Sequence, residues 1–433
     1  MRSKFAEDVQ SWLKRVDNYW FGHGSPTTMG LFRILMGSLI FINFAMISVD
    51  FNAWFSEKGF TPQAVTNQFQ PPVPLSFNFF GYDIYRPDIS IPRVNLLSNV
   101  YNDHITLAFY IGVMVFALMT ALGLWTRFSS IALAVGVVSL HHRNGLILHG
   151  GDTILRVSCL YIAMAPSGAA CSLDRLIGLW RGKIQPGPVR TSMWVQRLLA
   201  YNVALVYFTT FWHKFGFGNQ WRNLTATWYP ARLNEFTRFP VPSFVNNLPV
   251  VYFTTGMTLV TELALGTLVF YRPLRKYVLL AGLLMHGFIE YSMNIPLFSF
   301  LMATTYISFF EGVEVESWAK KLGERLSRFR ATIFLPVGKR FNVNAANAIA
   351  ATDPLGLVTY EEGDATWRAV SGGKDVKPFR ASLARSVGAW IIGTVPYLWK
   401  RLLTGALEDA PDEPQSTSEH LVSRKKKRVT GST

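Results

Sequence analysis

The stretch MGLFRILMGSLIFINFAMISV, residues 29–49, contains a single charged side chain, Arg33, among apolar and small residues. A helix of about 20 largely apolar residues is long enough to cross the hydrocarbon core of a bilayer. No small-residue cleavage site follows this stretch, so we do not expect it to be a removable signal peptide. The stretch therefore predicts a membrane-spanning helix that is also the targeting element of the chain.

Similar runs recur along the chain, at residues 105–125, 128–147, 152–169, 197–213, 250–271, 277–293 and 297–311. Hydrophobic residues make up 50% of the sequence and charged residues 16%, against about 25% charged residues in a typical soluble domain. This composition excludes a largely disordered chain. With only Cys159 and Cys171, the chain is neither a disulfide-stapled scaffold nor a cysteine-rich zinc module. The sequence predicts an all-α fold, a polytopic integral membrane helical bundle of about eight spans.

The basic residues indicate how such a bundle is oriented. Lys plus Arg number 42 against 27 Asp plus Glu, a net charge of +15, and many of the basic residues flank apolar runs in short loops. This placement follows the positive-inside rule, so we expect both ends of the bundle to be cytoplasmic and no nucleic-acid partner. The long loops 50–104 and 214–249 then face the other side of the membrane.

The predicted spans and loops divide the chain into three regions. Residues 1–28 form a cytoplasmic segment, residues 29–311 the transmembrane domain, and residues 312–433 a basic cytoplasmic region. Within the last, residues 316–330 have the pattern of a helix lying on an anionic membrane surface. Residues 386–399 are interpreted as an interfacial helix, and the run 424–428 belongs to a disordered basic tail that could engage a partner protein.

Lys214 is the leading candidate for a catalytic residue. Ionisable groups at bilayer depth are costly and are functional candidates by default. Lys214 lies among aromatic residues, Phe211, Trp212, Phe215 and Phe217, and an amine that loses hydration there favours its neutral form, which can act as a base. The alternative is a lysine that extends from a helix end to the headgroups, beside an ordinary aromatic belt.

Two further polar clusters lie in the apolar runs. In the segment 141–156, Asp152 and Arg156 have the i,i+4 spacing of a structural ion pair on one helix face. His142, His149 and Asp152 could instead approach a metal ion, but no motif supports this and we predict no metal site. In the second cluster, His286, Glu290 and Asn294 repeat every four residues, which suggests either a functional polar face or a seam of hydrogen bonds between helices.

Five stretches resemble the HTTM family, the membrane domain shared with vitamin K-dependent γ-carboxylase. They are SPTTMGLFRILMG (25–37), NAWFSEKGFTP (52–62), HHRNGLILHGGDTILR (141–156), APSGAACSLDR (165–175) and WHKFGFGNQW (212–221). The resemblance covers roughly residues 15–311. It implies that Lys214 is the base that deprotonates vitamin K hydroquinone and that His286 is a second active-site residue. The expected substrate- or cofactor-binding residues are His213, Trp212, Trp221, His142, Asn144 and Glu290.

The chain also departs from the animal carboxylase. His213 stands where that enzyme has a second lysine, and the lumenal domain that engages its protein substrate has no counterpart in the predicted regions. We therefore expect an enzyme-like protein that carboxylates or otherwise modifies a small molecule or peptide, with reduced vitamin K or another quinol as cofactor. The alternative is a non-enzymatic membrane assembly, export or immunity factor. A transporter is disfavoured because the sequence has no inverted repeat.

Overall fold

The computed structural model describes residues 2–69, 73–79, 82–91, 94–234, 236–327, 331–336, 355–364, 368–371 and 374–376, with residues 344, 347, 348, 350 and 351. It forms two compact units. The first contains residues 1–174 and 188–315, and the second contains residues 175–187 and 316–433. The interfacial helix expected at 386–399 and the basic run 424–428 lie outside the described residues.

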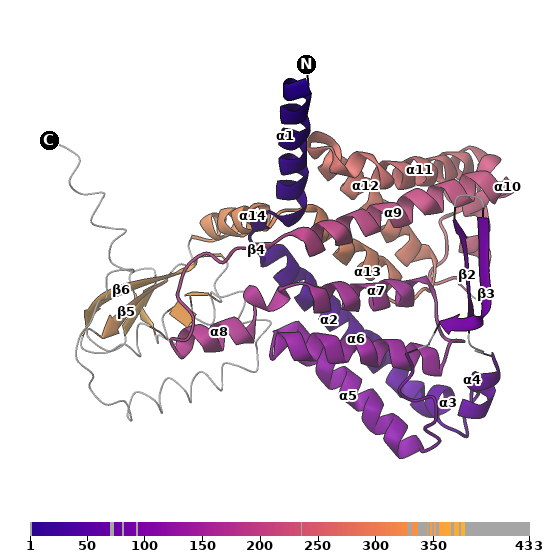
Figure 1. The fold of residues 1–433 in the computed structure, drawn as a ribbon, viewed down its shortest axis with the longest axis horizontal. Helices are drawn as coiled ribbons and strands as arrows, with labels where there is room; N and C mark the ends of the chain where they lie inside the picture. Colours follow the sequence, from indigo (N-terminus) through magenta and orange to yellow (C-terminus); the bar gives the residue numbers. More distant parts are fainter. Residues whose placement is uncertain are drawn as a thin grey trace. The chain divides into compact units, whose positions relative to one another are not determined.

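Helices dominate the first unit (Figure 1). The long ones are α1 (Arg2–Phe21), α2 (Thr27–Ile47), α5 (Asp103–Leu122), α6 (Thr126–Arg143), α7 (Gly150–Met164), α9 (Trp194–Phe217), α11 (Leu248–Gly266) and α12 (Arg272–Ser292). Shorter helices complete it: α3 (Phe51–Phe55), α4 (Gln63–Phe69), α10 (Asn219–Arg222), α13 (Phe298–Thr305) and η7 (Tyr306–Phe309). Helices α8 (Leu173–Trp180) and α14 (Gly312–Arg325) run from the first unit into the second.

Each apolar run predicted from the sequence overlaps one of these helices. Among the described residues, three helical segments are long and apolar enough to cross a membrane, namely Thr27–Phe55, Asp103–Leu122 and Leu248–Gly266. Helices α7 and α13 are shorter, and α6, α9 and α12 carry more polar side chains. The chain is thus mostly helical, with three helices that meet the requirements of a span by length and composition.

Strands are the main correction to the all-α prediction. Strands β2 (Val73–Phe79) and β3 (Tyr82–Ile91) form an antiparallel hairpin in the long loop after α3. In the second unit, β5 (Ala331–Pro336) lies between β6 (Val358–Asp364), which is parallel to it, and the antiparallel β7 (Arg368–Ser371), which pairs with β8 (Lys374–Val376). These strands fall in segments without long apolar runs, so a search for membrane-spanning helices passes over them.

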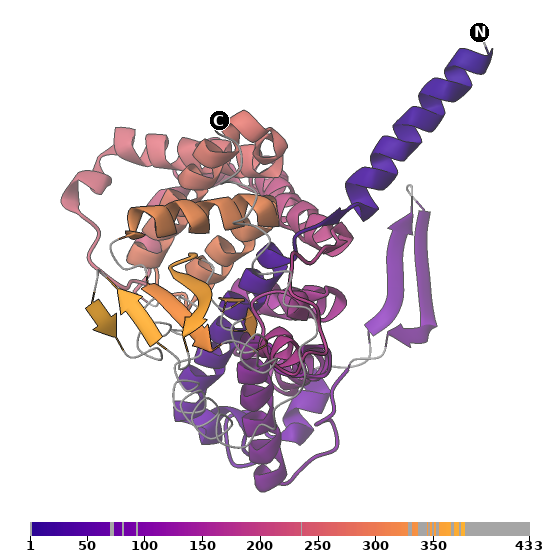
Figure 2. The same ribbon diagram turned by 90° about the vertical axis from the view of Figure 1, so that its left-hand side faces the viewer.

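Helix α1 projects away from the other helices of the first unit, as Figures 1 and 2 both show. Only its last turn contacts α9, where the Trp20 and Tyr201 rings lie 5.2 Å apart and the Arg197 guanidinium lies 4.5 Å from the centre of the Tyr19 ring. The short strands β1 (His23–Gly24) and β4 (Thr191–Ser192) pair directly after it. These contacts fix the point at which α1 leaves the bundle.

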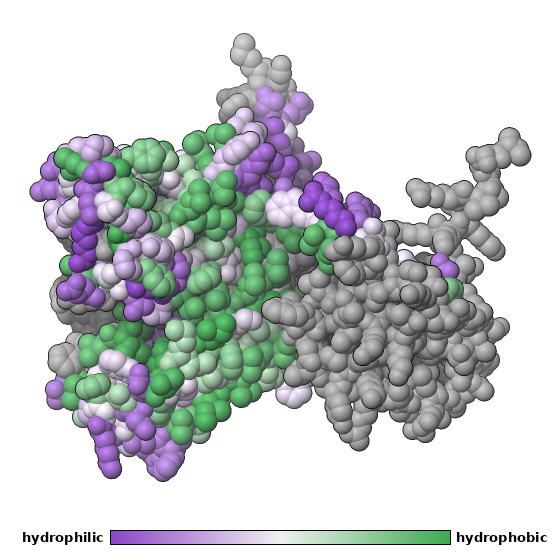
Figure 3. All heavy atoms as spheres, turned by 180° about the vertical axis from the view of Figure 1, so that it is seen from behind, coloured by the Kyte–Doolittle hydropathy of each residue, from purple (hydrophilic) through white to green (hydrophobic). Residues whose placement is uncertain are grey.

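The bundle carries apolar side chains on its outside and polar ones within. Helix α12 exposes Tyr277, Leu280 and Leu284 but buries His286, which is 3% exposed. Figure 3 shows hydrophobic residues spread over one face of the bundle, with hydrophilic residues gathered towards the ends of the helices. A surface of this kind is stable against lipid and costly against water. The arrangement therefore fits a bundle surrounded by a bilayer.

Arg33 joins three parts of the first unit from a position with no exposed surface. Its guanidinium donates hydrogen bonds to the carbonyl oxygens of Thr120 and Ala121 at the end of α5, and to those of Ser167 and Cys171 after α7. The carbonyl end of a helix is the negative end of its dipole, which favours a cation there. Arg33 is thus a structural residue that fastens α2 to the end of α5 and to the turn after α7.

Gly123 makes this contact possible. It ends α5 in the left-handed conformation, with φ of 69°, which a glycine adopts without a steric penalty. A Cβ atom at this position would also lie 2.8 Å from the Arg33 guanidinium carbon. One residue therefore provides both the helix cap and the space for the buried arginine.

We expect Arg33→Met to lower the free energy of unfolding by at least about 3 kcal/mol, because it leaves several buried carbonyl groups without a donor. Arg127→Met is the matched control, since Arg127 is exposed and also donates to a carbonyl oxygen, that of Ala163. Thermal unfolding in detergent micelles would measure both variants. Equal losses for the two would contradict the structural role of Arg33.

Candidate functional site

Lys214 and Glu262 form an ion pair between α9 and α11. Lys214 Nζ donates to Glu262 Oε1, and the side chains are 23% and 6% exposed, respectively. Both charges thus lie in a largely desolvated environment, where their attraction is strong but their separation from water is costly. The amine is turned towards the neighbouring helix and does not extend out along α9.

Trp221 covers this ion pair. Its ring centre lies 4.4 Å from Lys214 Nζ, a cation–π contact. The turn from α9 into α10 brings the ring there, and Gly218 permits it because a Cβ atom at Gly218 would lie 2.6 Å from the ring. The sequence KFGFGNQW (214–221) thus folds back so that its tryptophan closes over its lysine.

A buried chain of hydrogen bonds lies beside the pair. The Tyr207 hydroxyl contacts His286 Nε2 at 2.7 Å and the Tyr306 hydroxyl at 2.8 Å. These three side chains come from α9, α12 and η7, and each is less than 5% exposed. Gly282, one turn before His286, leaves room for the Tyr306 hydroxyl, which a Cβ atom there would meet. His286 is therefore held by Tyr207, which is held in turn by Tyr306.

The Lys214–Glu262 ion pair and the hydrogen-bonded chain His286–Tyr207–Tyr306 form one polar region in the bundle. Lys214 is close enough to interact electrostatically with His286, and Glu262 is close enough to interact with both tyrosines. Glu262 Oε2 and His286 Nδ1 are buried and have no hydrogen-bond partner. Buried polar atoms without partners are uncommon and costly. They mark places where a ligand or a transferred proton could be received.

The start of α7 adjoins this region through Phe298. The Phe298 and His286 rings lie 5.6 Å apart, and the same phenyl ring is 3.8 Å from the Cβ position of Gly150, the first residue of α7. Gly150, near the end of the segment 141–152, is thus separated from His286 by one phenyl ring.

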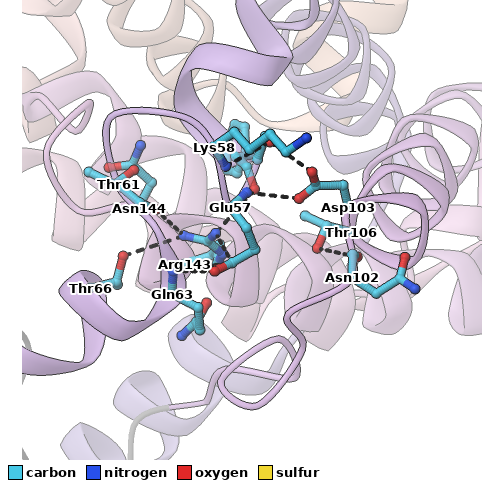
Figure 4. Close-up of polar contacts among 12 residues, drawn as sticks. Glu57, Lys58, Thr61, Gln63, Thr66, Asn102, Asp103, Thr106, Arg143 and Asn144 are labelled. Atoms are coloured by element: carbon cyan, nitrogen blue, oxygen red, sulfur yellow. Dashed lines mark hydrogen bonds and ion pairs between the residues drawn. The ribbon is translucent and has the colours of Figure 1, made fainter.

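Arg143, which has no exposed surface, organises the other part of the 141–152 segment (Figure 4). It donates to Glu57 Oε1 at 2.9 Å, to the Thr61 carbonyl oxygen at 2.8 Å and to the Phe55 carbonyl oxygen at 3.1 Å. Its neighbour Asn144, also fully buried, donates to the Trp54 carbonyl oxygen at 2.8 Å. The stretches HHRNG and NAWFSEKGFTP are thus fastened together. This makes Asn144 a loop-holding residue in the structure.

A family model described as the HTTM domain matches residues 86–313 of the chain. This chain belongs to the HTTM family. The resemblance predicted from the sequence is confirmed, although the matched region begins at residue 86 and not near residue 15. It includes Lys214, Glu262, His286 and both tyrosines. No curated protein and no solved structure matches the chain.

Of the binding residues expected from the HTTM resemblance, Trp221 lies at Lys214, whereas Trp212 and His213 do not. Both are exposed, with Trp212 packed against Phe211 and His213 against Phe217. Successive residues of a helix point in different directions, so neighbours of Lys214 in sequence need not share its face. His142 contacts the Val94 carbonyl oxygen at 2.8 Å, which makes it a loop contact beside Asn144.

Glu290 lies one turn beyond His286 and pairs with Arg238 from the loop before α11. Tyr291 holds the same loop by donating to the Pro240 carbonyl oxygen at 2.9 Å. Asn294 lies beyond the end of α12, so the polar face predicted for this helix consists of His286 and Glu290. In the structure, Glu290 fastens a loop and His286 belongs to the buried region.

The sequence interpretation missed three members of the site, Glu262, Tyr207 and Tyr306. A signal was available for Glu262, because a lone carboxylate in the apolar run VTELALG needs a partner at bilayer depth. Tyrosines in apolar helices are common, so nothing in the sequence distinguished Tyr207 or Tyr306.

The predicted Asp152–Arg156 ion pair is not formed. Asp152 is the third residue of α7, and its carboxylate turns back to accept from the His149 backbone N–H at 2.8 Å, in a capping box. It also lies 3.7 Å from nitrogens of His141 and His149, while Arg156 contacts Thr153. Within the described residues, no group of three or more His, Cys, Asp or Glu is placed to hold a metal ion.

We expect Asp152→Ala to destabilise the protein by about 1–2 kcal/mol, because it removes a helix cap. Arg156→Ala should change stability by less than about 0.5 kcal/mol. Thermal unfolding of the two single variants and the double variant would test this. A double variant more stable than Asp152→Ala would instead support a direct Asp152–Arg156 pair.

Proposed function

We propose that this HTTM protein is a membrane enzyme of the γ-carboxylase superfamily that uses a lipophilic quinol, such as reduced vitamin K. Its substrate is a small molecule or peptide, which it carboxylates or otherwise modifies, and Lys214 is the base. The observation that supports this most directly is the position of Lys214. Its amine is turned towards Glu262 on the neighbouring helix, in one polar region with His286.

The residues present fit a quinol. Glu262 Oε2 and His286 Nδ1 are buried atoms without partners, and either could meet a hydroxyl group. Trp221 offers an aromatic surface beside the lysine. When bound, the quinol would supply, through its oxidation by molecular oxygen, a base strong enough to remove a proton from carbon.

The side chains of the site would transfer protons and exclude water. Lys214 takes a hydroxyl proton, and Trp221 keeps water from the amine. Tyr207, which is itself hydrogen-bonded to Tyr306, holds the His286 ring through its Nε2 atom, and this leaves Nδ1 to accept or release a proton in a later step.

The proposal includes the full topology. We propose that the helices within the predicted runs make eight spans, that both ends of the bundle are cytoplasmic, and that the site faces the non-cytoplasmic half. The charge asymmetry of the loops and the apolar exterior of α12 support this arrangement. Shorter helices such as α7 fit it because neighbours bury their ends.

Cys171 is a natural reporter of this topology, because it is exposed whereas Cys159 is buried. It should resist a membrane-impermeant thiol reagent in intact cells and react after permeabilisation. A cysteine placed at Ser243, exposed in the long loop before α11, should react in intact cells. Mass spectrometry would measure both, and the opposite pattern would overturn the orientation.

The role of Lys214 can be tested with vitamin K hydroquinone added to the full-length protein in lipid nanodiscs. Lys214→Arg and Lys214→Ala should both slow its oxidation by about 10²–10⁴-fold, because a guanidinium cannot act as a base. Mass spectrometry of the extracted quinone products is the readout.

Lys276→Arg is the matched control, since Lys276 is exposed at the start of α12 and lies over the Tyr277 ring. It should leave turnover unchanged. Full activity of a folded Lys214→Arg variant, or no oxidation by the wild type, would instead favour a non-enzymatic assembly or export role.

A further inference from the structure

The ion pair raises a question about the proposed base, because a lysine paired with a carboxylate starts as an ammonium ion. The structure offers a comparison in the Arg238–Glu290 pair, whose glutamate lies on α12, one turn beyond His286. In both pairs a basic nitrogen contacts one carboxylate oxygen, and the second oxygen is buried without a partner. The pairs differ in the base and in burial, since Glu290 is 17% exposed and Glu262 6%.

Glu262 is poorly compensated as an anion. Lys214 is its hydrogen-bond donor, and Oε2 has none. The neighbouring hydroxyls of Tyr207 and Tyr306 are engaged with each other and with His286. A carboxylate and an ammonium ion that have lost their water shells are both raised in energy, and this cost can exceed their attraction.

An ammonium ion and a carboxylate can remove this cost if one proton moves from the nitrogen to the oxygen. The N–H bond of the ammonium breaks and an O–H bond forms on the carboxylate, which leaves a neutral amine beside a carboxylic acid. The net charge of the pair does not change, so no counterion has to enter the bundle. An arginine cannot do this, because guanidinium does not release its proton in proteins.

We propose that Glu262 is the proton-holding partner of Lys214, and that the two form a lysine–glutamic acid dyad inside the bundle. The inference rests on the proposed function, in which Lys214 acts as a base. Glu262 is a positioning residue in that scheme. It takes the lysine proton and so leaves a neutral amine in the polar region that also contains His286. Arg238–Glu290 remains an ion pair that holds a loop.

Infrared spectroscopy of the full-length protein in nanodiscs, without any quinone, tests this directly. A protonated carboxyl group has a carbonyl band separate from the bands of a carboxylate. The wild type should show such a band near neutral pH, Glu262→Gln should remove it, and Glu262→Asp should shift it. Glu290→Gln is the matched control and should leave the band unchanged, because Glu290 is paired with an arginine.

Lys214→Arg gives the sharpest test, since it keeps Glu262 and a positive partner but removes the transferable proton. The band should then be lost although the glutamate is still present. Wild-type protein without the band, or a band that persists in Lys214→Arg, would overturn the dyad. Neither outcome depends on quinol oxidation, so a dyad without turnover would separate a failed function from a failed inference.

Discussion

A bundle with an apolar exterior has to satisfy its backbone carbonyl groups internally, and two buried arginines meet this constraint in the HTTM unit. Arg33 binds the carbonyl ends left by α5 and the turn after α7, and Arg143 binds those of the loop after α3. Each joins two of the stretches that carry the family resemblance. The helices that carry the candidate site are positioned against this framework.

The sequence was a good guide to helices, because a span needs a long apolar run and little else. It also indicated Lys214 and His286, since ionisable groups are rare at bilayer depth. The sequence did not predict side-chain contacts that depend on where a helix begins or on how helices pack together. Asp152 has the spacing to meet Arg156, yet its place in the first turn of α7 directs the carboxylate to the helix N-terminus. Tyr207 and Tyr306 come together only because α9, α12 and η7 pack around them.

The charged residues inside the bundle fall into two kinds. Arg33 and Arg143 contact mainly carbonyl oxygens at the ends of helices. Their guanidinium groups do not release a proton in proteins. Lys214 and Glu262 lie near the C-terminal ends of α9 and α11, His286 lies within α12, and each of the three can gain or lose a proton. The arginines thus supply permanent charge that satisfies carbonyl groups, whereas the exchangeable charges gather between α9, α11 and α12.

The Arg33 contacts also depend on the order in which the parts of the chain are synthesised. The carbonyl groups that receive its guanidinium lie 87 to 138 residues later in the chain. When α2 is synthesised, those partners have not yet been made. The buried contacts of Arg33 can therefore form only after Cys171 has left the ribosome, so the joint between α2, α5 and the turn after α7 closes only after all three parts have been made.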